Sequence, residues 1–161
     1  MIRLLQVLTI LINITLFPVW LKADESYIPI LVPVTGFLSL EGTAQRNGAI
    51  QALDKAPINL NIKYEVSDTA TSPEVAVTAL HRALSRGQPA AIAAPIFGTQ
   101  MLAMLPIAKR ASVALITVSG TAKLTELNNP FIFRFFPGDS VVKVAHARYI
   151  HEAVSYTHLT L

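Results

Sequence analysis

The chain has 161 residues, with thirteen basic and ten acidic side chains, four histidines and no cysteine. Its length fits one domain of ordinary size, and an apolar content of 52% is sufficient for a hydrophobic core. The lack of cysteine excludes disulfides, thiol catalysis, iron–sulfur clusters and zinc sites with cysteine ligands.

Residues 1–23 are predicted to be a secretory signal peptide. Met1–Arg3 carries positive charge, Leu4–Leu21 carries none, and Ala23 is a small residue at the expected cleavage point. An uncleaved anchor is the alternative, because such an uncharged stretch just reaches across a bilayer. Without Arg3 and Lys22 the net charge falls to about +1. No stripe of basic residues runs along the chain, so no nucleic-acid partner is expected.

Five strands and four helices alternate along the rest of the chain. The expected strands are Tyr27–Val34, Ile62–Val66, Ala90–Ile96, Val113–Val118 and Phe131–Phe135. The expected helices are Gly42–Ala56, Pro73 up to Gly87, Thr99–Arg110, and a last one from Asp139 or Ser140 to about Val154. This order predicts an α/β fold, with a parallel sheet and helices on both faces.

The helix that begins at Pro73 has the clearest signals. Ser72 is its expected N-cap, Glu74 lies at the positive end of its dipole, and Gly87 is expected to end it in a left-handed conformation. Its predicted buried stripe is Val75, Ala76, Ala79, Leu80, Ala83 and Leu84. In the helix before it, the inward positions are Ala49, Ile50, Leu53 and Ala56. In the helix after it, Pro106 is expected to interrupt or kink the chain.

Polar and small residues follow three of the strands, in the stretches Pro33–Gly42, Ala94–Gln100 and Val113–Leu127. Ligands of such sheets bind beyond the carboxyl ends of the strands. In the third stretch, Ser119 and Thr121 offer hydroxyls, Gly120 lets backbone amides come close, and a following helix adds partial positive charge. The motif therefore predicts a neutral cradle for a carboxylate or similar anion. Ordinary helix capping is the alternative interpretation.

Enzyme and metal signatures are weak. The segment VSGTA lacks the glycine that a nucleophile elbow has two residues before its serine, so an exported hydrolase using Ser119 is only a minor alternative. His146 and His151 are five residues apart, which is the wrong spacing for two ligands on one helix face, and His81 is expected on a solvated face. Asp68 is expected in a turn or cap, or near a ligand. No metal or cofactor is predicted.

Several stretches, in this order and spacing, resemble a known family. They are ILVPVTGFLSLEGTAQRNGAIQAL, EVSDTATSPEVAVTAL, AAIAAPIFGTQ, VALITVSGTAKLTEL and PFIFRFFPGDS. From about Ile28 to Val154 the chain is similar to the first lobe of type I periplasmic solute-binding proteins, the branched-chain amino-acid group that serves ABC transporters. The resemblance implies a periplasmic, non-enzymatic protein that binds a small amino acid or related solute by hinge closure. Its implied partner is an inner-membrane ABC permease.

The resemblance also implies ligand-binding positions. Thr121 matches a hydroxyl contact, Ser119 a backbone contact, and Gly120 lies between them. Gly98 stands where the family has a serine-like contact, with Thr99 beside it. Glu41 stands where an aromatic side chain is common, with Phe37 nearby. Glu41 thus favours a ligand with a positive or hydrogen-bond-donating end, although an exposed position in water is the alternative.

The same resemblance divides the chain. Residues 24–137 are expected to form the N-terminal lobe, and residues 138–154 the crossover and first helix of a second lobe. Residues 155–161 resemble a non-native tail. The alternative to transport is a ligand-sensing ectodomain of a membrane signalling receptor, which has lobes of the same kind.

Overall fold

A computed structural model describes residues 25–57 and 60–153. The predicted signal peptide and the predicted tail at 155–161 lie outside these residues. The strands are β1 (Ser26–Val32), β2 (Ile62–Asp68), β3 (Ile92–Ala93), β4 (Leu115–Thr117) and β5 (Ile132–Arg134). The helices are α2 (Ser39–Asp54), α3 (Pro73–Arg86), α4 (Gly98–Ala111), α5 (Lys123–Glu126) and α6 (Asp139–Ala153).

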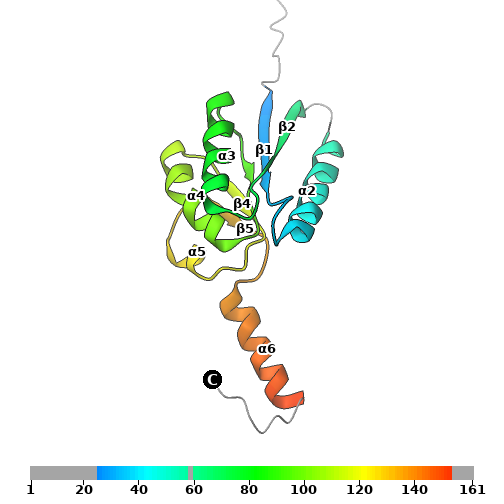
Figure 1. Ribbon diagram of the computed structural model, residues 1–161, viewed down its shortest axis with the longest axis vertical. Helices are drawn as coiled ribbons and strands as arrows, with labels where there is room; N and C mark the ends of the chain where they lie inside the picture. The colour runs from blue at the N-terminus through cyan, green and yellow to red at the C-terminus, as the bar shows by residue number, and fades with distance from the viewer. Residues whose placement is uncertain (1–24, 58–59, 154–161) are drawn as a thin grey trace, which may run out of the picture.

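The five strands form one parallel sheet in the order β2-β1-β3-β4-β5. Figure 1 shows α3 and α4 on one face of this sheet and α2 on the other, so the predicted α/β class with helices on both faces is confirmed. The first strand lies between β2 on one side and β3 on the other, and the chain continues from β3 through β4 to β5 at the far edge. The carboxyl ends of all five strands consequently meet at one edge.

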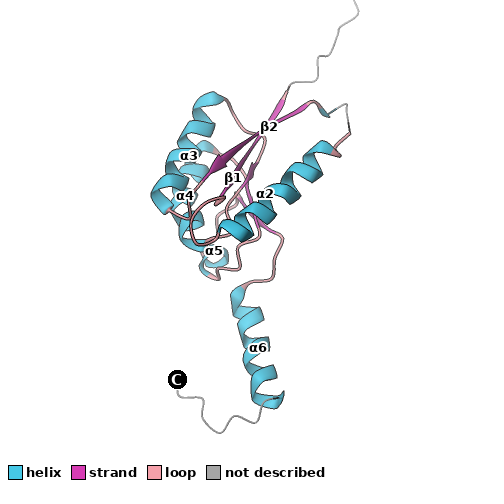
Figure 2. Cartoon of the chain, turned by 45° about the vertical axis from the view of Figure 1, so that its right-hand side comes forward, coloured by secondary structure: helices cyan, strands magenta, loops and turns pink. Residues whose placement is uncertain are grey.

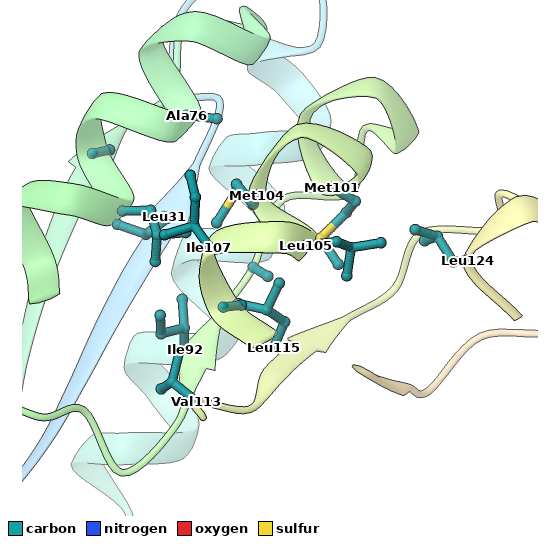
Figure 3. Packing of buried hydrophobic residues seen from close by; sticks show 14 residues of the cluster. Leu31, Ala76, Ile92, Met101, Met104, Leu105, Ile107, Val113, Leu115 and Leu124 are labelled. Atoms are coloured by element: carbon teal, nitrogen blue, oxygen red, sulfur yellow. The ribbon is translucent and has the colours of Figure 1, made fainter. Parts of the chain in front are cut away.

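The hydrophobic core lies between the sheet and the α3–α4 pair. Ile92 and Leu115 from the strands pack against Met101 and Met104 of α4, and all four side chains are fully buried. Figure 3 shows these side chains converging from the two layers. The α2 face is less well covered among the described residues, and the four inward positions predicted for α2 are only half-buried.

The α3 helix follows its sequence signals closely. The Val75 amide donates to the Ser72 hydroxyl at 3.3 Å, which confirms the predicted N-cap. Ala76, Ala79, Leu80 and Ala83 are buried as predicted, and Leu84 is half-buried. Two details are corrections. Val75 is 39% exposed, because it lies at the margin of the apolar stripe. Gly87 has φ 157° and ψ 179°, a positive-φ conformation that favours glycine but is not the left-handed helical one predicted from the sequence.

The other differences concern element ends. The third strand has only two residues, because Pro95 has no N–H to extend the ladder. The α2 helix begins at Ser39, three residues before the prediction, since the Ser39 amide already bonds the Gly36 carbonyl in the preceding turn. Pro106 does not interrupt α4, which continues to Ala111. The helix expected after Thr121 is the single turn α5.

The last helix, α6, begins at Asp139, one of the two predicted starting residues. It projects away from the sheet on the side of the strand carboxyl ends, as both ribbon views show (Figures 1 and 2). None of its residues is buried, and Val141 and Tyr149 are both more than 60% exposed. The packed part of the described chain therefore ends with β5 and the short segment that follows it.

Candidate functional site

Two strand ends that are far apart in the sequence meet in one pocket. The pocket has a volume of about 380 Å³ at the carboxyl edge of the sheet. It is lined by Leu38, Ile96, Phe97, Gly98, Thr99, Leu102, Ser119, Gly120, Thr121 and Asp139. Five of the seven residues predicted to contact a ligand are in this lining. The topology explains this, because β3 and β4 are neighbours and the loops that follow them lie side by side.

The first turn of α4 forms one wall of the pocket. Phe97 occupies the N-cap position and its side chain makes no capping hydrogen bond. The first amides of a helix have no acceptor within the helix, so the N–H groups of Gly98 and Thr99 are available at this wall. The α4 helix has fourteen residues, and its dipole adds partial positive charge there. The sequence placed this charge on the helix after Thr121, but α5 has only four residues and α4 provides it instead.

The opposite wall is the loop between β4 and α5. Ser119 is fully buried, and its amide donates to the Thr117 hydroxyl at 3.0 Å. The Thr117 hydroxyl in turn donates to the Pro95 carbonyl at 2.8 Å, which ties this loop to the end of β3. The Ser119 amide is thus engaged within the protein, whereas the half-buried Thr121 is the residue of this loop whose hydroxyl lies at the pocket.

The two walls are in close contact at Gly98. A Cβ atom on Gly98 would overlap the hydroxyl of Thr121 and come within 2.8 Å of the Thr121 Cβ. Glycine is therefore required for α4 to begin where it does. The serine-like contact implied at this position by the resemblance has no room here, and the exposed Thr99 supplies the neighbouring hydroxyl.

The other two predicted residues lie outside this lining. Phe37 is 74% exposed and packs edge-on against Phe97, with ring centroids 5.3 Å apart. Glu41 lines an adjoining apolar groove of about 550 Å³ between α2 and the sheet, with Gln45, Ile116 and Phe135 among its neighbours. Ile96 lines both the groove and the pocket, and Val118 of the groove directly precedes Ser119, so Glu41 lies in an adjoining hollow rather than in the pocket lining itself.

Asp68 holds the loop after β1 in place. Its Oδ1 atom accepts from the amides of Val34, Thr35 and Ala70 at 2.8–3.2 Å, and Oδ2 accepts from the Thr35 hydroxyl at 2.5 Å. Burial opposes ionisation of this carboxyl, but the four hydrogen bonds, with the Thr35 hydroxyl first, outweigh it and lower the pKa of Asp68 below its ordinary value. Asp68 therefore has the turn-forming role that the sequence favoured.

Three residues of this region were not found from the sequence. Gln100 is fully buried, and its Nε2 donates to the carbonyls of Thr69 and Ser72, which fastens the loop after β2 to α4. Asp139 places a carboxylate in the pocket lining, and its amide donates to the Gly120 carbonyl at 2.6 Å. Arg134 donates to the Thr121 carbonyl at 3.2 Å. Each of these contacts joins segments at least thirteen residues apart, so no local pattern reveals it.

The described residues contain no catalytic histidine or metal arrangement near this pocket. His81, His146 and His151 are all exposed, and none of them lines it. The Ser119 hydroxyl is within 3.4 Å of the Thr121 hydroxyl, so it has no general base as its partner. Within residues 25–57 and 60–153 there is no group of metal-ligating side chains. No helix in that part of the chain is long and apolar enough to cross a membrane.

Comparison with protein families agrees with this geometry. The family model described as periplasmic binding protein matches residues 25–156, which is most of the chain. The chain belongs to the periplasmic binding protein family. The resemblance seen in the sequence is thereby confirmed, and the five-stranded sheet has the type I arrangement. Members of this family are binding proteins.

Solved periplasmic binding proteins share this fold at low sequence identity. A leucine-binding protein, LivK, of Thermotoga maritima is 23% identical, with a TM-score of 0.75 over 81% of this chain and 38% of its own. The substrate-binding protein LivJ of Streptococcus pneumoniae, in complex with isoleucine, is 20% identical, with a TM-score of 0.73 over 82% and 39%. A solute-binding protein of Rhodopseudomonas palustris, in complex with 3,4-dihydroxybenzoic acid, is 24% identical, with a TM-score of 0.62 over 69% and 31%.

The chain spans about two fifths of the length of the first two of these proteins. No curated protein matches the sequence significantly.

Proposed function

We propose that this chain is the ligand-binding N-terminal lobe of an extracytoplasmic solute-binding protein, and that its solute is an amino acid or a related carboxylate or amide. The observation that carries the proposal is the pocket at the carboxyl edge of the sheet. It combines the free amides at the start of α4 with the Thr121 hydroxyl and the Asp139 carboxylate. Amides and a hydroxyl suit the carboxylate of a ligand, and a carboxylate of the protein suits an ammonium or amide N–H.

Three features support this ligand class. The α4 N-terminus offers positive potential without a full charge, so the carboxylate does not need a buried arginine or lysine. Asp139 lines the same pocket, and its carboxylate, which pairs with the exposed Lys143 at 3.3 Å through Oδ2, suits a zwitterion better than a simple acid. Leu38, Ile96 and Leu102 provide apolar surface for a small side chain. The named ligands of LivJ and of the Rhodopseudomonas protein also carry a carboxyl group.

The proposed mechanism is closure of a second lobe over a ligand that first binds to this one. Ligand contacts with both lobes stabilise the closed form relative to the open one. The closed protein then delivers its solute to an ABC permease in the inner membrane. A ligand-sensing ectodomain would use the same pocket, and no contact among the described residues favours that role over transport.

Replacement of Thr121 by valine tests the site. The variant T121V keeps the shape of the side chain and removes its hydroxyl. We expect binding of L-isoleucine to the full chain to weaken about tenfold, the effect of losing one hydrogen bond to a charged group. Isothermal titration calorimetry measures this, and L-isoleucinamide, which lacks the carboxylate, should bind more weakly than L-isoleucine to the unmodified chain.

The matched control is T78V, which makes the same change at an exposed hydroxyl that bonds only the Glu74 carbonyl within α3. This variant should bind as the unmodified chain does. Equal affinity of T121V and the unmodified chain for L-isoleucine would exclude the pocket as the binding site.

A further inference from the structure

Arg134 is the last residue of β5, at the edge of the sheet, and it is paired in register with Thr117 of β4. Its guanidinium group makes two hydrogen bonds across to the neighbouring loop. Nη1 donates to the Thr121 carbonyl at 3.2 Å, and Nη2 donates to the Thr125 hydroxyl at 2.7 Å. The Thr121 carbonyl also accepts from the Leu124 amide at 3.2 Å, so Arg134 bonds one group just before the single turn of α5 and one group within it.

The guanidinium of Arg134 donates to these two neutral acceptors and not to an Asp or Glu carboxylate. None of the ion pairs among residues 25–57 and 60–153 includes Arg134, although its side chain is half-buried. A planar guanidinium has donors fixed in different directions, so it can hold a carbonyl and a hydroxyl at the same time. The compact ammonium of lysine does not have this fixed fork. The geometry therefore points to a role in holding the loop.

The chain just after Arg134 holds the same loop a second time. The Asp139 amide donates to the Gly120 carbonyl at 2.6 Å. Gly138, which lies between Arg134 and Asp139 in the sequence, is buried. A Cβ atom on Gly138 would come within 2.9 Å of the Arg134 Nη2. The segment from Arg134 to Asp139 thus contacts two consecutive residues of the pocket loop and continues directly into α6. Figure 1 shows β5, α5 and the start of α6 at the same end of the molecule.

We propose that Arg134 is a positioning residue, which fixes the loop of Ser119, Gly120 and Thr121 and joins it to the segment that leads into α6. This inference rests on the proposed function where it concerns ligand binding, because it assigns a role within the same pocket. Arg134 does not line the pocket itself. It acts through the Thr121 carbonyl, so that the Thr121 hydroxyl faces the first turn of α4.

Amide hydrogen exchange on the full chain, followed by mass spectrometry, tests the positioning role without any ligand. The variants are R134K, T125V and T125S, and the matched control is R86K. Arg86 pairs with Glu65 far from the pocket. We expect amides of residues 118–125 to exchange about tenfold faster in R134K and T125V, because each loses a hydrogen bond to the charged guanidinium. T125S keeps the hydroxyl and should exchange as the unmodified chain does.

Amide hydrogen exchange in α3 shows whether a variant loosens only the pocket loop or destabilises the whole fold. Residues 73–86 should exchange at the unmodified rate in all four variants. Unchanged exchange of residues 118–125 in both R134K and T125V would overturn the inference. Equal acceleration in α3 and in the loop would also overturn it, because Arg134 would then only stabilise the fold. If R134K does not fold, the exchange of residues 118–125 in T125V still tests the positioning role of Arg134.

Calorimetry with L-isoleucine then tests the link to binding. We expect R134K to weaken binding about tenfold and R86K to leave it unchanged. Unchanged affinity in R134K, with a loosened loop, would refute the link. If the unmodified chain binds neither L-isoleucine nor 3,4-dihydroxybenzoic acid, the proposed function fails, and the exchange experiment still decides whether Arg134 positions the loop.

Discussion

Individual polar residues decide the shape of the pocket rim. Asp68 gathers three amides and a hydroxyl from two loops, and Gln100 binds two carbonyls of the loop that follows β2. The Gln100 Oε1 atom and the Thr69 hydroxyl are buried and have no hydrogen-bond partner within the described part of the chain. The rim is thus held by a small number of side-chain hydrogen bonds. Loss of the Gln100 bonds would leave further buried polar groups without a partner.

The variant D68N should lower the free energy of unfolding at pH 7 by about 1 kcal/mol, because the charged acceptor becomes a neutral amide. The pKa of Asp68 is lowered on folding, so its contribution is present above the unfolded pKa of about 3.9. It is lost as the pH falls through the lower folded value. Urea unfolding at several pH values measures both effects.

The difference between D68N and the unmodified chain should thus shrink as the pH falls below about 4. The control E126Q changes an exposed carboxylate that pairs with Lys123 at 3.3 Å. Such surface pairs contribute little, so this variant should stay close to the unmodified chain at every pH. A D68N effect that stays constant down to acid pH would contradict the role given to the charge.

At the scale of elements, the close approach of α4 to the β4–α5 loop forms the site. Both walls of the pocket come from elements whose ends meet because β3 and β4 are adjacent in the sheet. Gly98 is where the two elements come closest, and the Thr117 hydroxyl bonded to the Pro95 carbonyl is a second connection. A change at either place moves one wall relative to the other.

The variant G98A should destabilise the protein by about 1–3 kcal/mol, because the new methyl group overlaps Thr121 in a packed region. It should also weaken binding of L-isoleucine. Thermal unfolding and calorimetry measure the two effects.

The matched control is G48A. Gly48 lies inside α2, where an added Cβ meets no atom within 4 Å. Alanine is a better helix former than glycine, so G48A should stabilise the protein by about 0.5–1 kcal/mol. If both alanine variants change stability in the same direction, the contact between Gly98 and Thr121 does not restrain α4.

At the scale of the whole molecule, the two faces of the sheet differ. The α3–α4 face is closed by a packed core, whereas the α2 face leaves apolar side chains exposed at β4 and β5. Ile116 is 39% exposed and is paired in register with Phe133, which is 49% exposed. Phe135 lies two residues further along the same face and is 76% exposed. Contiguous apolar surface of this kind promotes association.

We therefore expect the chain to self-associate as its concentration rises, and we expect F133K to reduce this. The added charge interrupts the apolar surface at an exposed position, so the thermal unfolding midpoint should change little. Sedimentation velocity at several concentrations measures the association. The control V75K places the same charge on α3, at a side chain that is 39% exposed on the other face. Equal effects of the two lysines would show that net charge, not the α2 face, controls association.

The sequence by itself determined the class of the fold and most of its elements. Apolar runs separated by amphipathic segments require a parallel sheet with helical layers, and Ser72, Pro73 and Glu74 mark the start of α3 through local chemistry. It also predicted Ser119, Gly120 and Thr121 from their place at the end of a buried strand, with helix capping as the alternative, and Gly98 and Thr99 through the family resemblance. These signals are local, or they follow from the rule that parallel strands end at one edge.

The tertiary structure alone decided how those residues are held. It showed that α4, not α5, presents its N-terminus to the pocket, and that Glu41 lines an adjoining groove rather than the pocket itself. It also showed that Asp68, Gln100 and Arg134 connect loops that are distant in the sequence. The physical reason is that a hydrogen bond between loops depends on how neighbouring strands are ordered and aligned, and this order is set by packing of the whole sheet rather than by any local pattern.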